Sequence, residues 1–227
     1  MSDVQTSLTF RANAARAIKD APLRAAMRQA TDTFGAKRAD AFAPVADLEA
    51  LRDKASALRL QVLDRLQEYE EMFASRATRA GATVHRAKDA AAAREIIAGI
   101  LTDRGAKTVV KSKSMVSEEI HLNAHLEKEG LTVLETDLGE YIIQLVGETP
   151  SHIIVPAIHK NRQQVGRLFA EKLGVEYTED PQVLTKIARR TIREKFLTAD
   201  AGLSGANFAA AASGSLVLFT NEGNGRM

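Results

Sequence analysis

Residues 108–120 read TVVKSKSMVSEEI, in which a short β-branched run leads through two lysines and two serines into an acidic segment. β-branched residues favour strands, whereas the spacing of apolar residues that follows is typical of a helix. The same alternation recurs along the chain. The predicted strands are 83–84, 108–110, 131–134, 152–155 and 216–219, and the predicted helices are 88–103, 117–129, 161–173 and 181–199. Alternating strands and helices with short connections predict an α/β fold with a mostly parallel sheet flanked by helices.

The chain before Gly81 has a different pattern, which predicts helix throughout and no strand. We therefore divide the chain into a helical N-terminal extension, residues 1–80, and an α/β domain, residues 81–227. Within the extension, Asp47 is a suitable N-cap for one long helix whose apolar stripe we expect to pack in the core. The stripe comprises Leu48, Leu51, Ala55, Leu58, Val62, Leu66, Tyr69 and Phe73. Because only a polar Gly/Asn segment follows residue 219, we expect the domain to be incomplete at its C-terminus.

Composition restricts the classes of partner and cofactor. The 31 basic and 29 acidic residues leave a formal net charge of +2, which gives no reason to expect nucleic acid as a partner. The basic residues in 186–195 therefore predict a solvated helix face or docking to an acidic partner. With no cysteine, the chain cannot form a disulfide, a thiolate zinc site or a cysteine-ligated cluster, which is compatible with a cytoplasmic protein. No apolar run approaches the roughly 20 residues of a membrane span.

Four polar clusters follow predicted strands, at 111–114, 135–137, 156–160 and 220–224. In open α/β sheets, ligands bind beyond the carboxyl ends of the strands. We therefore expect these clusters to converge on one edge of the sheet and to form a ligand site there.

The first cluster predicts a cradle for an anion. Lys111 and Lys113 would supply charge, Ser112 and Ser114 would supply hydroxyl donors, and the N-terminus of the following helix would favour a phosphate or a carboxylate. The alternative is a solvated turn in which Ser114 or Ser117 caps that helix.

The other clusters supply candidate catalytic residues. Glu135 and Asp137 are two positions apart at a strand end, so that both side chains could point to one side and one could act as a general base. His159 could shuttle a proton, although packing is an equal alternative. His121 and His125 have the spacing of paired metal ligands but no third ligand, so we predict no metal site. The remaining ligand-binding candidates are Glu119, Lys160, Ser213, Gly214, Ser215, Asn221 and Glu222.

Three long segments carry a family resemblance: KSKSMVSEEIHLNAHLEKEGLTVLETDLGEYIIQL (111–145), PSHIIVPAIHKNR (150–162) and GANFAAAASGSLVLFTNEGNGR (205–226). Together and in this order they closely resemble the lactate utilization protein B family. The resemblance implies a fold similar to the ribose-5-phosphate isomerase and coenzyme A transferase group. It also implies a component of a bacterial complex that oxidises L-lactate to pyruvate, with the other subunits of that complex as partners.

The family continues into a ferredoxin-like region with cysteine-ligated [4Fe–4S] clusters. Because this chain has no cysteine, we expect it to be truncated before that region, to hold no cofactor of its own and to be inactive alone. Two alternatives remain open. One is an independent isomerase-like or transferase-like enzyme with Glu135 or Asp137 as its base, and the other is a non-catalytic docking subunit that binds partners through its N-terminal helices.

Overall fold

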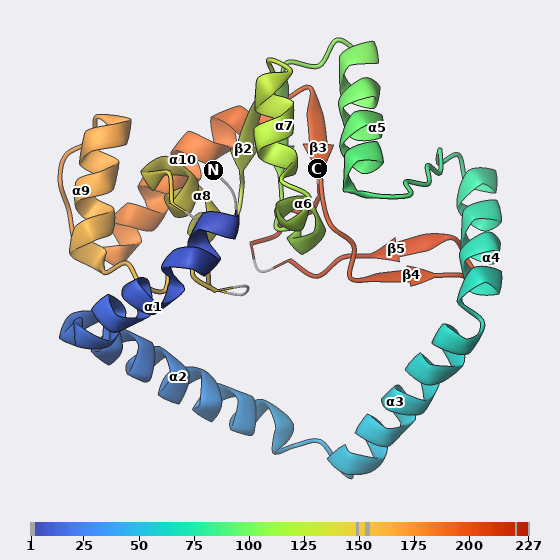
Figure 1. Ribbon diagram of the computed structural model, residues 1–227, viewed down its shortest axis with the longest axis horizontal. Coiled ribbons are helices and arrows are strands. Elements are labelled where there is room, and N and C mark those ends of the chain that lie inside the picture. The colour runs from blue at the N-terminus through green and yellow to red at the C-terminus, as the bar shows by residue number, and fades with distance from the viewer. Residues whose placement is uncertain (1–2, 149, 153–154, 221, 227) are drawn as a thin grey trace.

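A computed structural model describes residues 3–148, 150–152, 155–220 and 222–226 (Figure 1). Its centre is a three-stranded parallel sheet in the order β2-β1-β3. The strands are β1 (Thr108–Lys111), β2 (Thr132–Glu135) and β3 (Ala201–Leu203). Val109 on the central strand lies opposite Val133 of β2 and Ala201 of β3. The predicted α/β fold with a mostly parallel sheet is therefore confirmed.

Helices flank this sheet and bury its apolar side chains. They are α5 (Ala90–Asp103), α6 (Met115–Glu119), α7 (Leu122–Lys128), α8 (Leu138–Val146), α9 (Arg162–Leu173) and α10 (Pro181–Thr198). One core cluster packs α5 and α7 against the sheet. It includes Leu101 of α5, Leu126 of α7, and Val109 and Val133 of the strands. A second cluster, centred on Phe169, packs α8, α9 and α10 together. The α9 and α10 helices agree with the prediction, and Asn161 and Asp180 cap their N-termini.

Several element boundaries differ from the sequence prediction. The helix predicted over 117–129 is divided into α6 and α7 at His121, whose φ of 52° lies in the left-handed region. After this turn, Leu122 and Leu126, four positions apart on α7, both face the core. The predicted strand at 83–84 is wrong, because these residues form an irregular connection between α4 and α5. Of the strand predicted at 152–155, residues 153–154 lie outside the described chain, and His152 and Val155 are not in a strand.

The C-terminal strand prediction is correct in type and shifted in position. β5 (Ser215–Val217) pairs antiparallel with β4 (Phe208–Ala210) in a hairpin that is separate from the main sheet. The edge-to-face contact of Phe208 and Phe219, with ring centroids 6.1 Å apart, supports this hairpin.

The N-terminal extension forms an arm of helices, the middle part of which lies away from the sheet (Figure 1). Its helices are α1 (Asp3–Lys19), α2 (Ala21–Phe42), α3 (Leu48–Asp64) and α4 (Leu66–Arg79). Asp47 caps α3 as expected, accepting a hydrogen bond from the Ala50 amide at 3.3 Å. No described helix is both long and apolar enough to cross a membrane.

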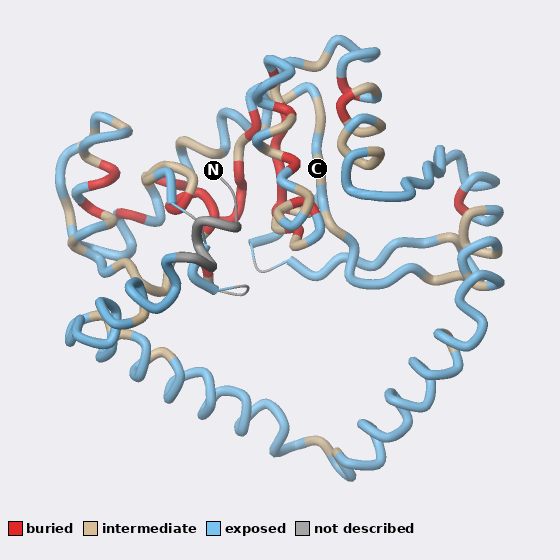
Figure 2. The backbone as a smooth tube through the Cα atoms, in the orientation of Figure 1, coloured by how far each residue is buried: buried red, intermediate tan, exposed pale blue. Residues whose placement is uncertain are grey.

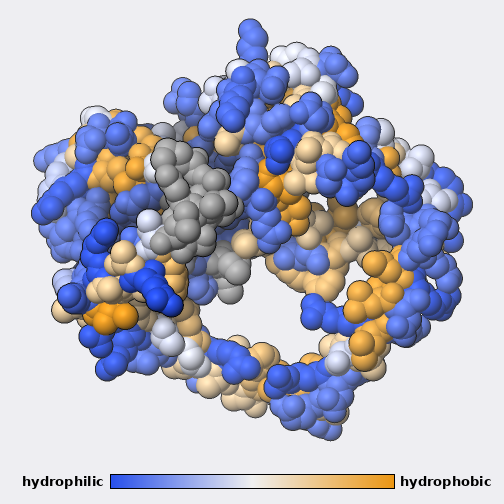
Figure 3. Space-filling model, in the orientation of Figure 1, coloured by the Kyte–Doolittle hydropathy of each residue, from blue (hydrophilic) through white to orange (hydrophobic). Residues whose placement is uncertain are grey.

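The prediction of one long, core-packed helix in this arm is wrong on two points. The helix breaks at Arg65, where φ is −126° and ψ is 30°. Of the apolar stripe, Leu51 and Leu58 retain 54% and 60% of their surface exposed, and α3 contains no buried residue (Figure 2). Figure 3 shows an opening between the body and the middle part of the arm, so α3 has no core to pack against.

Candidate functional site

Lys111 lies at the carboxyl end of β1 and is buried, with 1% of its surface exposed. Its ammonium nitrogen is 2.8 Å from Glu135 Oε1 and 3.0 Å from Ser117 Oγ. The Asn123 side-chain amide donates to the same Glu135 oxygen at 2.7 Å. Burial raises the pKa of Glu135, an effect that Lys111 opposes. Lys111 and Glu135 therefore form a closed, buried ion pair between the two strand ends.

Lys113 is also paired with a carboxylate. Its ammonium nitrogen is 2.7 Å from Oε1 of Glu140, which lies in the first turn of α8 and is almost completely buried. Glu118 of α6 is half-buried near both lysines and Glu140, and burial raises its pKa. Glu118 and Glu140 were not predicted as site residues, because their approach to Lys113 depends on how α6 and α8 pack. The charges of the two lysines are thus largely balanced within the protein.

The two serines of the cluster have different surroundings. The Ser114 hydroxyl accepts a hydrogen bond from the Ser117 amide at 3.2 Å and caps α6, which confirms the capping alternative for Ser114. The Ser112 hydroxyl lies 2.7 Å from the hydroxyl of Ser204, which follows β3. Because α6 has only five residues, its dipole offers little support for an anion.

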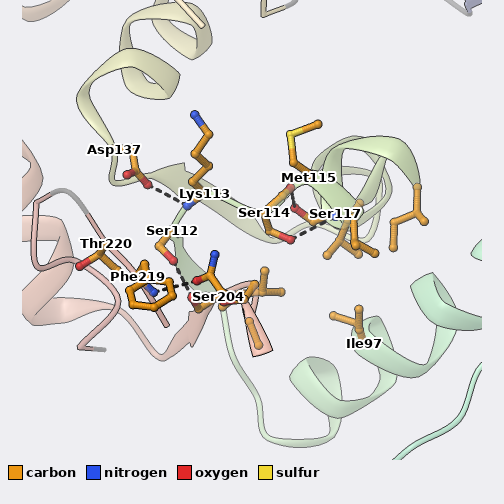
Figure 4. Close-up of a pocket in the computed structure, with 17 residues that line it drawn as sticks. Ile97, Ser112, Lys113, Ser114, Met115, Ser117, Asp137, Ser204, Phe219 and Thr220 are labelled. Atoms are coloured by element: carbon orange, nitrogen blue, oxygen red, sulfur yellow. Dashed lines mark hydrogen bonds between the residues drawn. The ribbon is translucent and has the colours of Figure 1, made fainter. Parts of the chain in front are cut away.

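A cavity of about 540 Å³ opens where β1 and β3 end (Figure 4). Ser112, Ser114 and Ser204 contribute to its polar lining, together with Thr220 from the C-terminal segment. Ile97 of α5 and Phe219 belong to its apolar lining. In Figure 4, Ser112 and Ser204 point toward each other, and the Lys113 side chain extends away from them. The hydroxyl pair, rather than the lysines, is the central polar feature of this cavity.

Asp137 attaches the C-terminal segment to this edge of the sheet. Its Oδ2 accepts hydrogen bonds from the Lys113 amide at 2.7 Å and from the Asn224 side-chain amide at 2.8 Å. Asn224 also donates to Thr136 Oγ1 at 2.9 Å. Glu222 accepts from the Leu138 amide at 3.1 Å and thereby satisfies a free N–H group at the start of α8. Burial raises the pKa of Glu222.

The structure therefore brings together three of the four predicted clusters: 111–114, 135–137 and 220–224. Asp137 lines the cavity, whereas Glu135 forms the buried ion pair with Lys111. The two carboxylates therefore do not point to the same side, contrary to the sequence prediction. Side chains alternate between the two faces of a sheet only within a strand, and β2 ends at Glu135, before Asp137. Asn221 lies outside the described residues.

The fourth cluster forms a separate group around Glu148. The His159 ring lies between the Ser151 hydroxyl and the Glu148 carboxylate, and Lys160 forms an ion pair with the other oxygen of Glu148. Hydrogen bonding from Lys160 lowers the pKa of Glu148. Neither His159 nor Lys160 lines the 540 Å³ cavity.

Four further candidates also lie away from this cavity. Glu119 is exposed at the end of α6. Ser213 and Gly214 lie in the turn between β4 and β5, and Ser215 is the first residue of β5; the Ser213 hydroxyl contacts that of Ser215 at 3.0 Å. Gly214, with φ of 73°, packs so closely on the backbone of Arg76 and Ala77 in α4 that a side chain would collide with it. Gly214 therefore packs the hairpin against α4.

No group of three or more histidine, cysteine or acidic residues in the described chain is arranged to hold a metal ion. His121 and His125 do not share one helix, since His121 precedes the first residue of α7, and His125 faces Glu95 at 3.7 Å. An iron–sulfur cluster needs thiolate ligands, and the sequence has no cysteine. The donor set of this chain therefore does not fit such a cluster.

Comparison with known proteins places these features in a family. The model of the LUD domain matches residues 70–227. The chain is 42% identical to "Lactate utilization protein B" of Bacillus subtilis (strain 168), over 96% of this chain and 46% of the relative. It is also 42% identical to "Uncharacterized electron transport protein YkgF" of Escherichia coli (strain K12), over 99% of this chain and 47% of the relative.

The chain thus spans about half the length of these curated relatives. No solved structure matches it, so the predicted similarity to the isomerase and transferase fold group stays a prediction. The family model covers the sheet, the flanking helices and the serine-lined cavity. The chain therefore belongs to the LUD domain family, and its sequence is that of a relative of lactate utilization protein B.

Proposed function

We propose that this chain supplies the ligand-binding domain of a bacterial system that oxidises L-lactate to pyruvate. The support is the LUD domain match and the 42% identity to lactate utilization protein B over nearly the whole chain. In this proposal the chain acts in the cytoplasm beside other subunits of the system. Iron–sulfur electron transfer would take place on residues other than these, because no thiolate is available here.

We further propose that a small hydroxy acid or keto acid binds in the 540 Å³ cavity. The observation that carries this proposal is the hydroxyl pair of Ser112 and Ser204 at the carboxyl edge of the sheet. A hydroxyl can donate a hydrogen bond to a carboxylate or accept one from an alcohol. The pair can therefore bind either the carboxylate or the 2-hydroxyl group of lactate. Ile97 and Phe219 offer apolar surface for a methyl group or a longer chain.

The hydrogen bonds already present limit how the hydroxyls serve a ligand. Ser204 donates either to Ser112 or to the Gly205 carbonyl, which lies 3.0 Å away. When Ser204 donates to Ser112, the Ser112 proton is available to a carboxylate. When it donates to Gly205, Ser112 donates to Ser204 and its lone pairs remain available to an alcohol. The pair can thus change from binding an alcohol to binding a carboxylate by rotating two hydroxyls.

Of the three catalytic candidates, Asp137 is the one that lines this cavity, so we assign any proton transfer to it rather than to Glu135 or His159. The lysine cluster has a supporting role in this proposal. Lys113 anchors the start of α8 through Glu140, and Lys111 fixes the strand ends through Glu135.

Calorimetric titration with L-lactate, pyruvate and a longer 2-hydroxy acid tests the proposal. The variant Ser112→Ala/Ser204→Ala removes both hydroxyls and should weaken binding by roughly tenfold or more, because each hydrogen bond contributes about 0.5–1.5 kcal/mol. The matched control is Ser213→Ala, which removes a serine hydroxyl from the β4–β5 turn. Equal affinities of all three proteins, or no binding of any acid, would refute this assignment of the cavity.

A further inference from the structure

A second cavity, of about 860 Å³, lies between α10 and the C-terminal segment 222–226. Three arginines line it: Arg189 and Arg193 from α10, and Arg226 from the C-terminal segment. Residues four apart on a helix project from the same face, so Arg189 and Arg193 are neighbours. Two segments that are distant in sequence therefore direct arginines to one cavity.

None of these three guanidinium groups has an ion pair or a hydrogen bond with any residue in the described part of the chain. By contrast, Lys111 and Lys113 at the sheet edge are each paired with a carboxylate. Like charges four apart weaken a helix, so the proximity of the Arg189 and Arg193 charges is unfavourable in the absence of an anion. One carboxylate, Glu222, also lines the cavity, but it already accepts a hydrogen bond from the Leu138 amide.

The rest of the lining suits an organic ligand rather than a bare ion. Ile192 and Phe196 of α10 and Leu138 of α8 provide apolar surface. Asn224 lines the cavity, is buried, and its Oδ1 has no hydrogen-bond partner within residues 3–148, 150–152, 155–220 and 222–226. Most buried acceptors have a hydrogen-bond partner. The unpaired Asn224 Oδ1 is therefore a position at which a ligand hydroxyl or amine can donate.

We propose that this cavity binds a phosphorylated small molecule, with its phosphate groups on the three arginines and its organic part against Phe196 and Ile192. The planar guanidinium fork matches phosphate oxygens in paired hydrogen bonds. A volume of about 860 Å³ is within the range of pockets that enclose a whole organic ligand. This site is distinct from the serine-lined cavity and does not depend on lactate binding there. The site also gives a specific role to part of the basic face of α10. From the sequence, that face was predicted to be solvated or to dock an acidic partner.

The test is titration of the whole chain with pyrophosphate, with ADP and with a dicarboxylate, at low salt. Arg193→Gln and Arg226→Gln should each weaken the binding of pyrophosphate and ADP by roughly tenfold or more, because hydrogen bonds to charged groups are strong. Arg190→Gln is the matched control, since Arg190 is on the same helix but does not line the cavity. Its affinity should equal that of the unchanged protein. Arg193→Lys, which keeps the charge but not the fork, should lose less than Arg193→Gln.

Several results would overturn the proposal. They are the absence of saturable binding of pyrophosphate and ADP, an equal loss in Arg190→Gln, and tighter binding of the dicarboxylate than of pyrophosphate. Because the exposed guanidiniums have no partners in the described chain, each variant should keep the thermal unfolding midpoint of the parent protein. Affinity for lactate should also be unchanged in all of them, which separates this site from the serine-lined cavity.

Discussion

Replacing Lys111 by methionine should be among the most destabilising single changes at the sheet edge. The substitution keeps an unbranched side chain but removes the ammonium group 2.8 Å from Glu135 and 3.0 Å from Ser117. Glu135 would then be a buried carboxylate supported by the Asn123 amide alone among the described residues. Breaking a buried ion pair in this way costs about 3–5 kcal/mol. In a chain of this size that corresponds to a fall in Tm of about 6–20 °C.

Urea unfolding of Lys111→Met, Glu135→Leu and the double variant measures this effect directly. Removing both charges eliminates the unpaired carboxylate, so Lys111→Met/Glu135→Leu should recover most of the stability lost in Lys111→Met. Lys128→Met, at the exposed end of α7, is the control and should stay within about 0.5 kcal/mol of the parent protein. A loss below about 1 kcal/mol in Lys111→Met, or a double variant less stable than the sum of the single changes, would refute the reasoning.

Two further predictions concern pH dependence and the N-terminal arm. Burial raises the pKa of Glu118, so its contribution to stability is complete below its unfolded pKa and is lost as the pH rises through its folded pKa. Glu118→Gln mimics the protonated group, and its stability relative to the parent should therefore increase from pH 4.5 to pH 7.5 in urea unfolding; a constant difference would contradict this. Leu58→Gln, on the exposed stripe of α3, should change the free energy of unfolding by less than about 0.5 kcal/mol, whereas Leu126→Ala in the core should cost about 2–5 kcal/mol. A comparable loss in both would show that the stripe is packed.

Two strands of the sheet, β1 and β2, were predictable from sequence because their signals are local, whereas the third, β3 (Ala201–Leu203), was not predicted. The run Thr108–Val110 is β-branched, polar residues follow it, and the next apolar run, from Leu131, begins after a glycine. The division of the next helix at His121 was not predictable, since no proline or glycine marks it. It is set by the packing of Leu122 and Leu126 against the sheet, which is a property of the tertiary structure.

Periodicity also reveals a helix face without revealing what covers it. The spacing of Leu51 and Leu58 correctly indicated an amphipathic helix, but the position of that helix relative to the sheet is not encoded locally. The stripe was therefore assigned to a core, whereas α3 in the folded chain has no buried residue.

The position of the candidate site along the chain was predictable, but the hydrogen-bond and ion-pair partners of its side chains were not. The predicted strand end put residues 111–114 beside the cavity, because polar residues directly follow the β-branched run. Their partners come from distant parts of the chain, as Glu140 does for Lys113 and Ser204 for Ser112. The cavity formed by Arg226 with Arg189 and Arg193 likewise depends on where the C-terminal segment crosses α10. Such contacts follow from the fold rather than from spacing.

The claim that the serine-lined cavity is the acid-binding site is tested most directly by NMR titration of the isotope-labelled chain with L-lactate and with pyruvate. We predict saturable shifts of the amide signals of Ser112, Ser114, Ser204 and Thr220, which surround the cavity. The amides of Ser213 and Lys128 should not move. The claim would be contradicted if neither acid shifted the cavity signals, or if the largest shifts appeared around His159 and Lys160 instead.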